Sequence, residues 1–289
     1  MASKIENNKP VDPNARDIQI KTKLIALVGA VIVFSSVVVA TLSLTVFDKK
    51  QVQATEQQLL HSAEGALRVT EDWLITLQSC AAITSTREDV VNAILYSDED
   101  FLNDLIRDYT ELLDYEYMAL VDVSGRVIIG GVNGYSKGAN LSSSYSISKA
   151  LTGYPAHSFE SIDGKPYSAV YAYPIKQNDT VIAAVVFAYD LTTDDFITLM
   201  QKSYDVECTI FSGDMRVKST LSGVEGTALA NTAITGLVLG NGETYTGENK
   251  IKGKDYFSIY SPLKNDDGTI TGMLFIAKSL EEIESIKYT

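Results

Sequence analysis

The spacing of hydrophobic residues changes along the chain, and its first long segment is apolar on every side. From Leu24 to Phe47 there are 24 residues without a charge, whereas a hydrocarbon core about 30 Å thick requires roughly 20 helical residues. A cleaved signal peptide usually has an apolar stretch of only about 7 to 15 residues. The pattern therefore predicts an uncleaved membrane anchor, a single transmembrane helix over 24–47.

Basic residues before this helix predict its orientation. They are Lys4, Lys9, Arg16, Lys21 and Lys23. Cytoplasmic flanks carry an excess of Lys and Arg, so residues 1–23 are expected in the cytoplasm and the main domain outside the inner (plasma) membrane, although Lys49 and Lys50 weaken the asymmetry. No second apolar run of spanning length precedes Thr289. We expect that the chain ends outside the cell or is a fragment of a longer protein with an output module beyond Thr289.

After the anchor, apolar residues recur at helical spacing. This heptad stripe contains Leu59, Ala63, Ala66, Thr70, Trp73 and Leu77. It predicts one stalk helix from Asp48 to about Ser79. The stripe either packs on the chain's own following domain or pairs with a second copy in a homodimer through this helix. Two shorter helices are predicted next, one headed by Thr86 and one beginning at Ser97 with acidic residues in its first turn.

The rest of the chain repeats itself at an offset of about 89 residues. The segment GKPYSAVYAYPIKQNDTVIAAVVFAYDL (164–191) aligns with GKDYFSIYSPLKNDDGTITGMLFIAKSL (253–280), and upstream Arg126 aligns with Arg216. Each unit reads as strand, turn, strand, helical patch and three strands, with the patches near SISKALTG and NTAITGLVLG.

These elements predict an α+β fold, a long N-terminal helix followed by two tandem antiparallel-sheet modules with helices on one face of each sheet. We expect the stalk helix and the helix after it over 48–97, a membrane-distal module over 98–191 and a membrane-proximal module over 192–280. Residues 281–289 would begin an exit helix.

Composition and charge exclude several classes of protein. The 289 residues are 45% hydrophobic and 21% charged, which is typical of globular chains rather than disordered ones. A net charge of −13 would repel a polyphosphate, so nucleic acid is not expected as a partner. Two cysteines, Cys80 and Cys208, are too few for a disulfide scaffold or a four-thiolate zinc site, and they either pair or remain two buried thiols.

Motifs for catalysis and metal binding lack their structural context. Residues 134–138 fit the pattern G-x-S-x-G, and His157 with Asp163 could complete a triad. A nucleophile elbow needs a strand that runs directly into a helix, but here glycines precede the serine and ANLSSS follows the motif. His61 and His157 lie in no metal-ligand motif. We therefore expect no catalytic residue, no metal and no cofactor.

One predicted strand, TVIAAVVFAYD, points to a binding pocket. Alternation places Ile182, Ala184, Val186, Ala188 and Asp190 on one face. Small side chains leave room for a ligand, and Tyr171 and Tyr173 on the preceding strand share a face and could form an aromatic wall. A carboxylate beside aromatic rings suits an ammonium ligand.

The order of elements, together with several phrases, resembles the double Cache (dCache) extracellular sensor domain of bacterial methyl-accepting chemotaxis proteins and related sensor kinases. The phrases are LVDVSGRVIIG, GKPY to YPIK, VVFAYDL, GTAL, GETYTG and GTITGMLFIAKSL. The resemblance covers nearly the whole chain. It implies two tandem PAS-like modules, a dimeric membrane-bound receptor and a small-molecule ligand.

The resemblance also implies a role for Asp190. In family members that sense amines and amino acids, an Asp at the end of this strand holds the amino group of the ligand, and Asp190 matches that position. The second repeat has Ser279 there, so an acidic site is expected in the first module alone. The alternative is that Asp190 only caps the segment LTTDDF that follows it.

The sequence departs from the family's Arg-x-Trp-Tyr motif, whose arginine grips a ligand carboxylate. The corresponding stretch is Ser142–Ser146, with Ser144 and Tyr145 as candidate contacts. A plain α-amino acid is therefore not favoured, and a simple amine or a neutral polar solute fits equally well. Alternatively Tyr145 and its serines form an exposed loop.

The function that we expect is small-molecule sensing by a transmembrane chemoreceptor. The alternatives are a structural or adhesive ectodomain, or the sensor of a histidine kinase or cyclic-dinucleotide enzyme.

Overall fold

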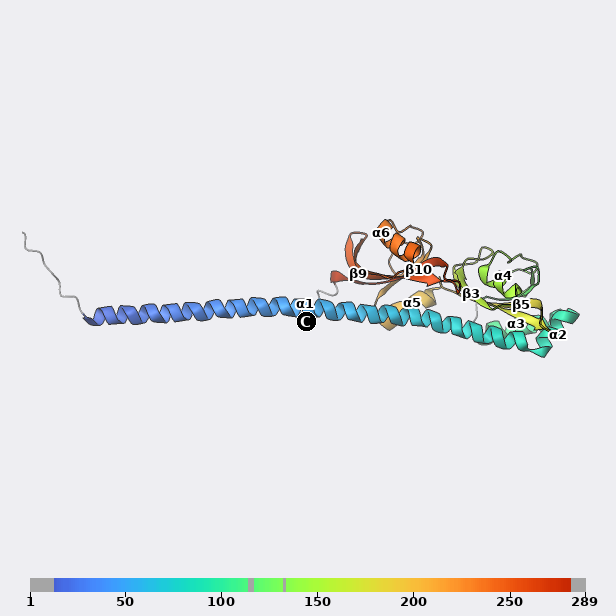
Figure 1. Ribbon diagram of the computed structural model, residues 1–289, viewed down its shortest axis with the longest axis horizontal. Helices are drawn as coiled ribbons and strands as arrows, with labels where there is room; N and C mark the ends of the chain where they lie inside the picture. The colour runs from blue at the N-terminus through green and yellow to red at the C-terminus, as the bar shows by residue number, and fades with distance from the viewer. Residues whose placement is uncertain (1–12, 114–116, 132–133, 282–289) are drawn as a thin grey trace, which may run out of the picture. The chain divides into compact units, whose positions relative to one another are not determined.

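A computed structural model describes residues 13–113, 117–131 and 134–281, and Figure 1 shows the elements. The helices are α1 (Pro13–Thr86), α2 (Glu88–Tyr96), α3 (Glu99–Leu113), α4 (Tyr145–Leu151), α5 (Asp194–Tyr204), α6 (Thr232–Thr235) and the π-helical turn η1 (Gly236–Gly240). The strands are β1 (Tyr117–Asp122), β2 (Val127–Gly130), β3 (Ala156–Glu160), β4 (Ser168–Gln177), β5 (Thr180–Asp190), β6 (Glu207–Ser212), β7 (Met215–Ser219), β8 (Tyr245–Ile251), β9 (Lys254–Lys264) and β10 (Ile270–Ser279). The chain divides into two compact units, Met1–Thr55 and Glu56–Thr289.

The described part of the first unit belongs to α1. Among the residues that the structure describes, the stretch Lys23–Phe47 is the one helix segment long and apolar enough to cross a membrane. Its side chains are exposed throughout, and an apolar helical surface of this length requires an apolar surrounding. This stretch matches the helix predicted at 24–47.

The second unit contains two five-stranded antiparallel sheets with one topology. The first sheet has the order β2-β1-β5-β4-β3 and the second the order β7-β6-β10-β9-β8. The predicted turns are present: the Gly125 amide donates to the Asp122 carbonyl at 2.9 Å, and the Gly268 amide donates to the Asn265 carbonyl at 3.0 Å. Both glycines have positive φ, 79° and 85°, which other residues adopt at a cost. The predicted α+β fold with an internal repeat is confirmed.

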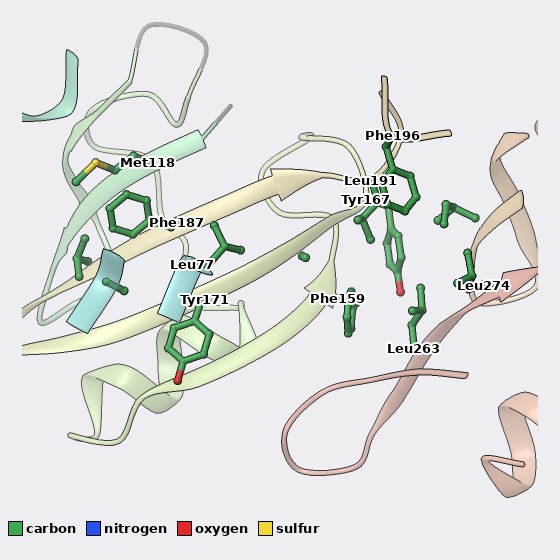
Figure 2. Packing of buried hydrophobic residues seen from close by; sticks show 14 of the residues in the cluster. Leu77, Met118, Phe159, Tyr167, Tyr171, Phe187, Leu191, Phe196, Leu263 and Leu274 are labelled. Atoms are coloured by element: carbon green, nitrogen blue, oxygen red, sulfur yellow. The ribbon is translucent and has the colours of Figure 1, made fainter. Parts of the chain in front are cut away.

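One hydrophobic core joins α1 to both sheets. Leu77 of α1, Phe187 of β5 and Leu274 of β10 are buried in the same cluster, and Figure 2 shows the packing of side chains from the two sheets in this cluster. A second, separate core lies between the first sheet and α4, and a third lies between the second sheet and α6 with η1. The prediction of helices on one face of each sheet was therefore wrong, because apolar residues alternate to both faces of the central strands.

The heptad stripe of α1 packs on the chain's own domain. Leu59, Ala66 and Leu77 are 2%, 0% and 1% exposed. Trp73 is half-buried, with its ring centroid 4.0 Å from that of Tyr189 and 4.8 Å from that of Phe196. The first of the two interpretations is confirmed, and the stripe is not available to a second copy.

The stalk helix is longer than predicted. It continues past Ser79 to Thr86, so the prediction that Thr86 heads the next helix was wrong. The break is confined to Arg87, whose extended backbone (φ −70°, ψ 122°) precedes α2. The Arg87 guanidinium donates to both carboxylate oxygens of Asp89, in the first turn of α2, at 3.0 and 2.7 Å. The predicted helix after Ser97 is present as α3.

Polar contacts join the two sheets beside the shared core. Asn265 is 7% exposed, and its Oδ1 accepts a hydrogen bond from the Phe159 amide at 2.9 Å. The Tyr167 hydroxyl and the Thr271 hydroxyl are 3.0 Å apart. A buried hydrogen bond is costly to leave unmade, so these contacts define how β3 of the first sheet meets β9 and β10 of the second. The thiols of Cys80 and Cys208 form no disulfide in the described part of the chain.

Replacement of Leu77 by Ala should destabilise the protein by about 2 to 5 kcal/mol, because it removes a fully buried side chain from the shared core. Ile75→Ala is the matched control two residues away: Ile75 is 58% exposed, and the expected change is about 0.5 kcal/mol. Urea unfolding of the full chain in detergent micelles, followed by circular dichroism, measures both. Equal losses for the two variants would contradict the assigned packing of α1.

Candidate functional site

The face of the first sheet that packs on α4 is built from small side chains. Ala119, Val121, Val170, Ala172, Ala184, Val186 and Ala188 are buried there. The repeat identifies what the second sheet has instead. Ala172 pairs with Val186 across β4 and β5, and the corresponding pair across β9 and β10 is Tyr260 with Phe275, whose ring centroids are 4.8 Å apart. Aromatic rings thus occupy in the second module the positions that small residues hold in the first.

Asp190 ends β5 on this small-residue face and is 7% exposed. Its Oδ1 accepts hydrogen bonds from the Thr192 amide at 2.7 Å and from the Thr192 hydroxyl at 2.6 Å. Its Oδ2 lies 3.5 Å from the Tyr117 hydroxyl. Asp190 therefore caps the residues that follow β5, as the alternative interpretation expected, while α5 itself is capped by Thr193. The second carboxylate oxygen faces an aromatic residue.

Two tyrosines and a lysine surround this end of the face. Tyr117 pairs with Ala188 across β1 and β5, so its side chain shares the face with Asp190. The Lys165 ammonium lies 5.5 Å from the centre of the Tyr117 ring, within cation–π range. Tyr135, 2% exposed, lies with its ring centroid 6.1 Å from that of Tyr117. Burial, followed by the negative charge of Glu160, raises the pKa of Tyr135 above its ordinary range, so its hydroxyl keeps its proton.

Glu160, at the end of β3, accepts a hydrogen bond from Ser144, which was predicted to contact a ligand. The Ser144 hydroxyl donates to Glu160 Oε1 at 2.8 Å, and the Ser146 hydroxyl lies 3.5 Å from the same atom. Ser158 donates to it as well. Ser144 is also the N-cap of α4, since its Oγ accepts from the Ile147 amide at 3.3 Å. The hydroxyl of Ser144 is therefore engaged with the protein itself.

Tyr145 begins α4 and is half-buried rather than part of an exposed loop. Burial and a hydrogen bond to Asp266 raise the pKa of Tyr145 to about 12. Asp266 lies in the turn between β9 and β10, so the hydroxyl of Tyr145 is directed to the second module. The structure does not bring it together with Asp190.

Tyr171 and Tyr173 lie on the other face of the first sheet. They pair with Phe187 and Val185 across β4 and β5, and both contact the shared core on the α1 side. The predicted aromatic wall beside Asp190 was therefore wrong, because the register places the two tyrosines one residue out of phase with the carboxylate. Tyr171 instead lines a separate cleft of 510 Å³ between α1 and the joint of the two sheets.

Of the predicted contacts, only Asp190 and Ala188 share the small-residue face within the sheet, with Ser144 at the start of the helix that covers it. Sequence reasoning missed Tyr117, Tyr135, Glu160 and Lys165. Tyr117 lies in a strand that pairs with β5, and every second residue of such a strand lies on the face of Asp190.

The described residues give no support for catalysis or metal binding. Ser136, the serine of the G-x-S-x-G pattern, lies in a loop between β2 and α4 rather than between a strand and a helix. Among the residues that the structure describes, no group of three or more His, Cys, Asp or Glu side chains could hold a metal ion.

Comparison with known proteins identifies the fold. Residues 190–289 match the model of the family described as single Cache domain 3, and no curated protein matches the chain. The sensor domain of the histidine kinase DctB from V. cholerae superposes with a TM-score of 0.59 at 13% identity, over 79% of this chain and 98% of that one. The ligand-binding domain of the Campylobacter jejuni chemoreceptor Tlp3, solved with L-valine, gives 0.54 at 12% identity, over 82% and 97%.

A third solved structure carries the same fold. A domain of a sensory box/GGDEF family protein from Vibrio parahaemolyticus gives a TM-score of 0.56 at 13% identity, over 81% of this chain and 99% of that one. The predicted resemblance to Cache sensor domains is thus confirmed at the level of fold. The solved structures with this fold include the sensor parts of three different kinds of signalling protein.

Replacement of Ser144 by Ala should destabilise the protein by about 1 to 3 kcal/mol, because it removes the cap of α4 and leaves the half-buried Glu160 one donor short. The matched control is Ser143→Ala, since Ser143 is exposed and should change stability by about 0.5 kcal/mol at most. Denaturant unfolding of both variants measures the difference, and a neutral Ser144→Ala would argue against the Glu160 network.

Proposed function

We propose that this protein is the extracytoplasmic sensing part of a transmembrane chemoreceptor, which binds a small polar molecule between the first sheet and α4 and passes the signal through the membrane. The observation that supports it best is the difference between the two modules. This face carries Tyr260 and Phe275 in one copy and the smaller Ala172 and Val186 in the other, and smaller side chains favour the first module as the one that binds a ligand.

The chemistry around Asp190 favours a cationic group in that ligand. A carboxylate that is 7% exposed attracts a cation, and the ring of Tyr117 next to it already has the Lys165 ammonium at 5.5 Å. A ligand ammonium would take the place of this side chain, with Asp190 Oδ2 and the Tyr117 ring as its partners. A simple amine fits this site better than an α-amino acid, because the chain lacks the arginine that grips a carboxylate in the amino-acid sensors that it resembles.

A structural or adhesive ectodomain is the second candidate, and one observation favours it. Thr192 satisfies one oxygen of Asp190, and Lys165 covers Tyr117, so the protein's own side chains could fill the site permanently. The sensor part of a histidine kinase or of a cyclic-dinucleotide enzyme is a further alternative to a chemoreceptor, since similar domains occur in proteins of these kinds.

Replacement of Asp190 by Asn should weaken the binding of primary amines with two to six carbons by about 10-fold or more, because a charge-assisted hydrogen bond is lost. The melting temperature of the empty protein should hardly change, since the Asn Oδ1 can still accept from Thr192. Ser279→Ala, at the repeat-equivalent position, is the matched control and should leave amine binding unchanged. Calorimetry on the full chain in nanodiscs measures the affinities, and full retention by Asp190→Asn would reject the site.

Replacement of Lys165 by Met separates the two candidate functions. If the site accepts a ligand, removal of the internal cation should tighten amine binding several-fold, since the ligand no longer competes with Lys165 for the ring of Tyr117. If the site is structural, the variant should lose stability and bind no amine at any concentration. Thermal unfolding with and without the amine panel gives both results from one set of samples.

The proposal includes a homodimer through α1, but through a face other than the stripe. Ile75 and Ile83 are 58% and 62% exposed and lie eight residues apart on the part of α1 that follows the membrane stretch, so they are two apolar positions open to a second copy. Cysteines placed at Ile75 or Ile83 should give crosslinked dimers in membranes, whereas a cysteine at the buried Leu59 should not. Equal yields at the three positions would reject a specific dimer through this helix.

A further inference from the structure

The second module contains a cleft that lies outside the site proposed above. Its volume is 510 Å³, and it is lined by the edge strands β7 and β8 and by the loop at 223–231. It borders the sheet face that Tyr260 and Phe275 fill, since Asn249 in its lining donates to the Tyr260 hydroxyl. The cleft is thus a place where the second module, whose sheet face is packed with aromatic rings, could still hold a small molecule.

The charged side chains of this cleft are mostly basic, whereas the chain as a whole has a negative net charge. The chain as a whole has a net charge of −13, whereas the charged side chains that line the cleft are Arg216, Lys250 and Lys252 with one carboxylate, Glu248. Asp255 lies 3.4 Å from the Lys250 ammonium and offsets it in part. A cleft with three cations and one acid attracts anions within an otherwise acidic surface.

Arg216 is the side chain best placed to hold an anion. It is half-buried, and its Nη1 donates to the Ala228 carbonyl at 2.9 Å and to the Thr227 hydroxyl at 3.0 Å. Its guanidinium lies 5.2 Å from the centre of the Phe211 ring. Among the residues that the structure describes, no carboxylate lies within ion-pair distance of Arg216, and its Nε and Nη2 have no hydrogen-bond partner. The free side of the guanidinium has the fork geometry that binds a carboxylate with two hydrogen bonds.

The equivalent arginine of the first module makes the same kind of loop contact. This contact alone therefore does not explain why Arg216 is half-buried. The repeat-equivalent residue, Arg126, donates from Nη1 to the Gly138 carbonyl at 3.2 Å, just as Arg216 does to Ala228. Arg126 is exposed, however, and its charge adds to the hydrogen bonds from Ser124 and from backbone amides that lower the pKa of the nearby Asp122 against the effect of burial. Both arginines hold their loop, but Arg216 is half-buried and has no carboxylate within ion-pair distance among the described residues.

Asn249 supplies an unmet acceptor in the same cleft. Its Nδ2 donates to the Tyr260 hydroxyl at 2.7 Å, while its Oδ1 is buried without a hydrogen-bond partner among the described residues. A buried polar atom of this kind normally has a partner. A hydroxyl group of a bound molecule would provide the missing donor.

We propose that the cleft between β7, β8 and the loop at 223–231 is a second ligand site, which binds a small organic carboxylate that also carries a hydroxyl group. Arg216 holds the carboxylate through Nε and Nη2, and Asn249 Oδ1 accepts the hydrogen bond of the hydroxyl. The site goes beyond the proposed function, because it uses no residue of the first module and would exist whether or not the first module binds an amine.

The test uses three small probes that differ in one group each: glycolate, acetate and glycolamide. Calorimetry or ligand-observed NMR on the full chain in nanodiscs of zwitterionic lipid should give saturable binding of glycolate. Acetate, which lacks the hydroxyl, should bind up to about 10-fold more weakly. Glycolamide, which lacks the charge, should show no saturation. Equal binding of all three probes, or no saturable binding of glycolate, would overturn the proposal.

Variants assign the binding to this cleft. Arg216→Gln should weaken glycolate binding by about 10-fold or more, whereas Arg126→Gln, the repeat-equivalent control, should not change it. Should Arg216→Gln fail to fold, Asn249→Asp keeps the size of the side chain and adds a like charge, so it should also lose glycolate. Asp190→Asn should retain glycolate binding, which distinguishes this site from that of the first module. Undiminished affinity in Asn249→Asp, or in a folded Arg216→Gln, would reject the assignment.

Discussion

The burial of one side of α1 against both sheets is the interaction on which the second unit depends. Leu77 and Ala66 have almost no exposed surface, and the cluster that contains them extends from Phe187 in the first sheet to Leu274 in the second (Figure 2). Each sheet has one apolar face in this cluster, which α1 covers together with residues of α2, α3 and α5. Neither module would retain its core if separated from α1, since apolar burial of this kind is the main favourable term in folding. The two modules are therefore one folding unit despite their internal repeat.

Because α1 occupies one face of both sheets, the difference between the modules lies on the opposite faces. In the second module, Tyr260 and Phe275 complete a core that needs nothing further. In the first, alanines and valines face α4, and the polar residues Asp190, Glu160 and Tyr135 gather at the margin of that face. Duplication of a stable sheet allows the two copies to differ in this way. One copy can keep large aromatic side chains in its core, while the other has smaller side chains and polar residues at the margin.

The fold was largely predictable from the sequence, and the site only in part. Local signals determined the elements: the uncharged run at 24–47, the heptad stripe, and the glycine turns after Asp122 and Asn265. The repeat then gave the shared topology. The prediction that placed Tyr171 and Tyr173 beside Asp190 failed because it depends on the register between strands. No single segment of the sequence determines that register. Alternation correctly paired Tyr171 with Tyr173 and Ala188 with Asp190, but only the pairing of β4 with β5 shows that the two pairs face opposite sides.

The position of Trp73 has an optical consequence. The chain contains one tryptophan, and its ring lies 4.0 Å from Tyr189, the residue before Asp190 in β5, and 4.8 Å from Phe196 in α5. The protein thus carries an intrinsic fluorophore at the contact between α1 and the strand that ends in Asp190. Any shift of β5 relative to α1 would change the polarity and the quenching of that indole. The emission spectrum can therefore report motion between the sheet and the helix without an attached dye.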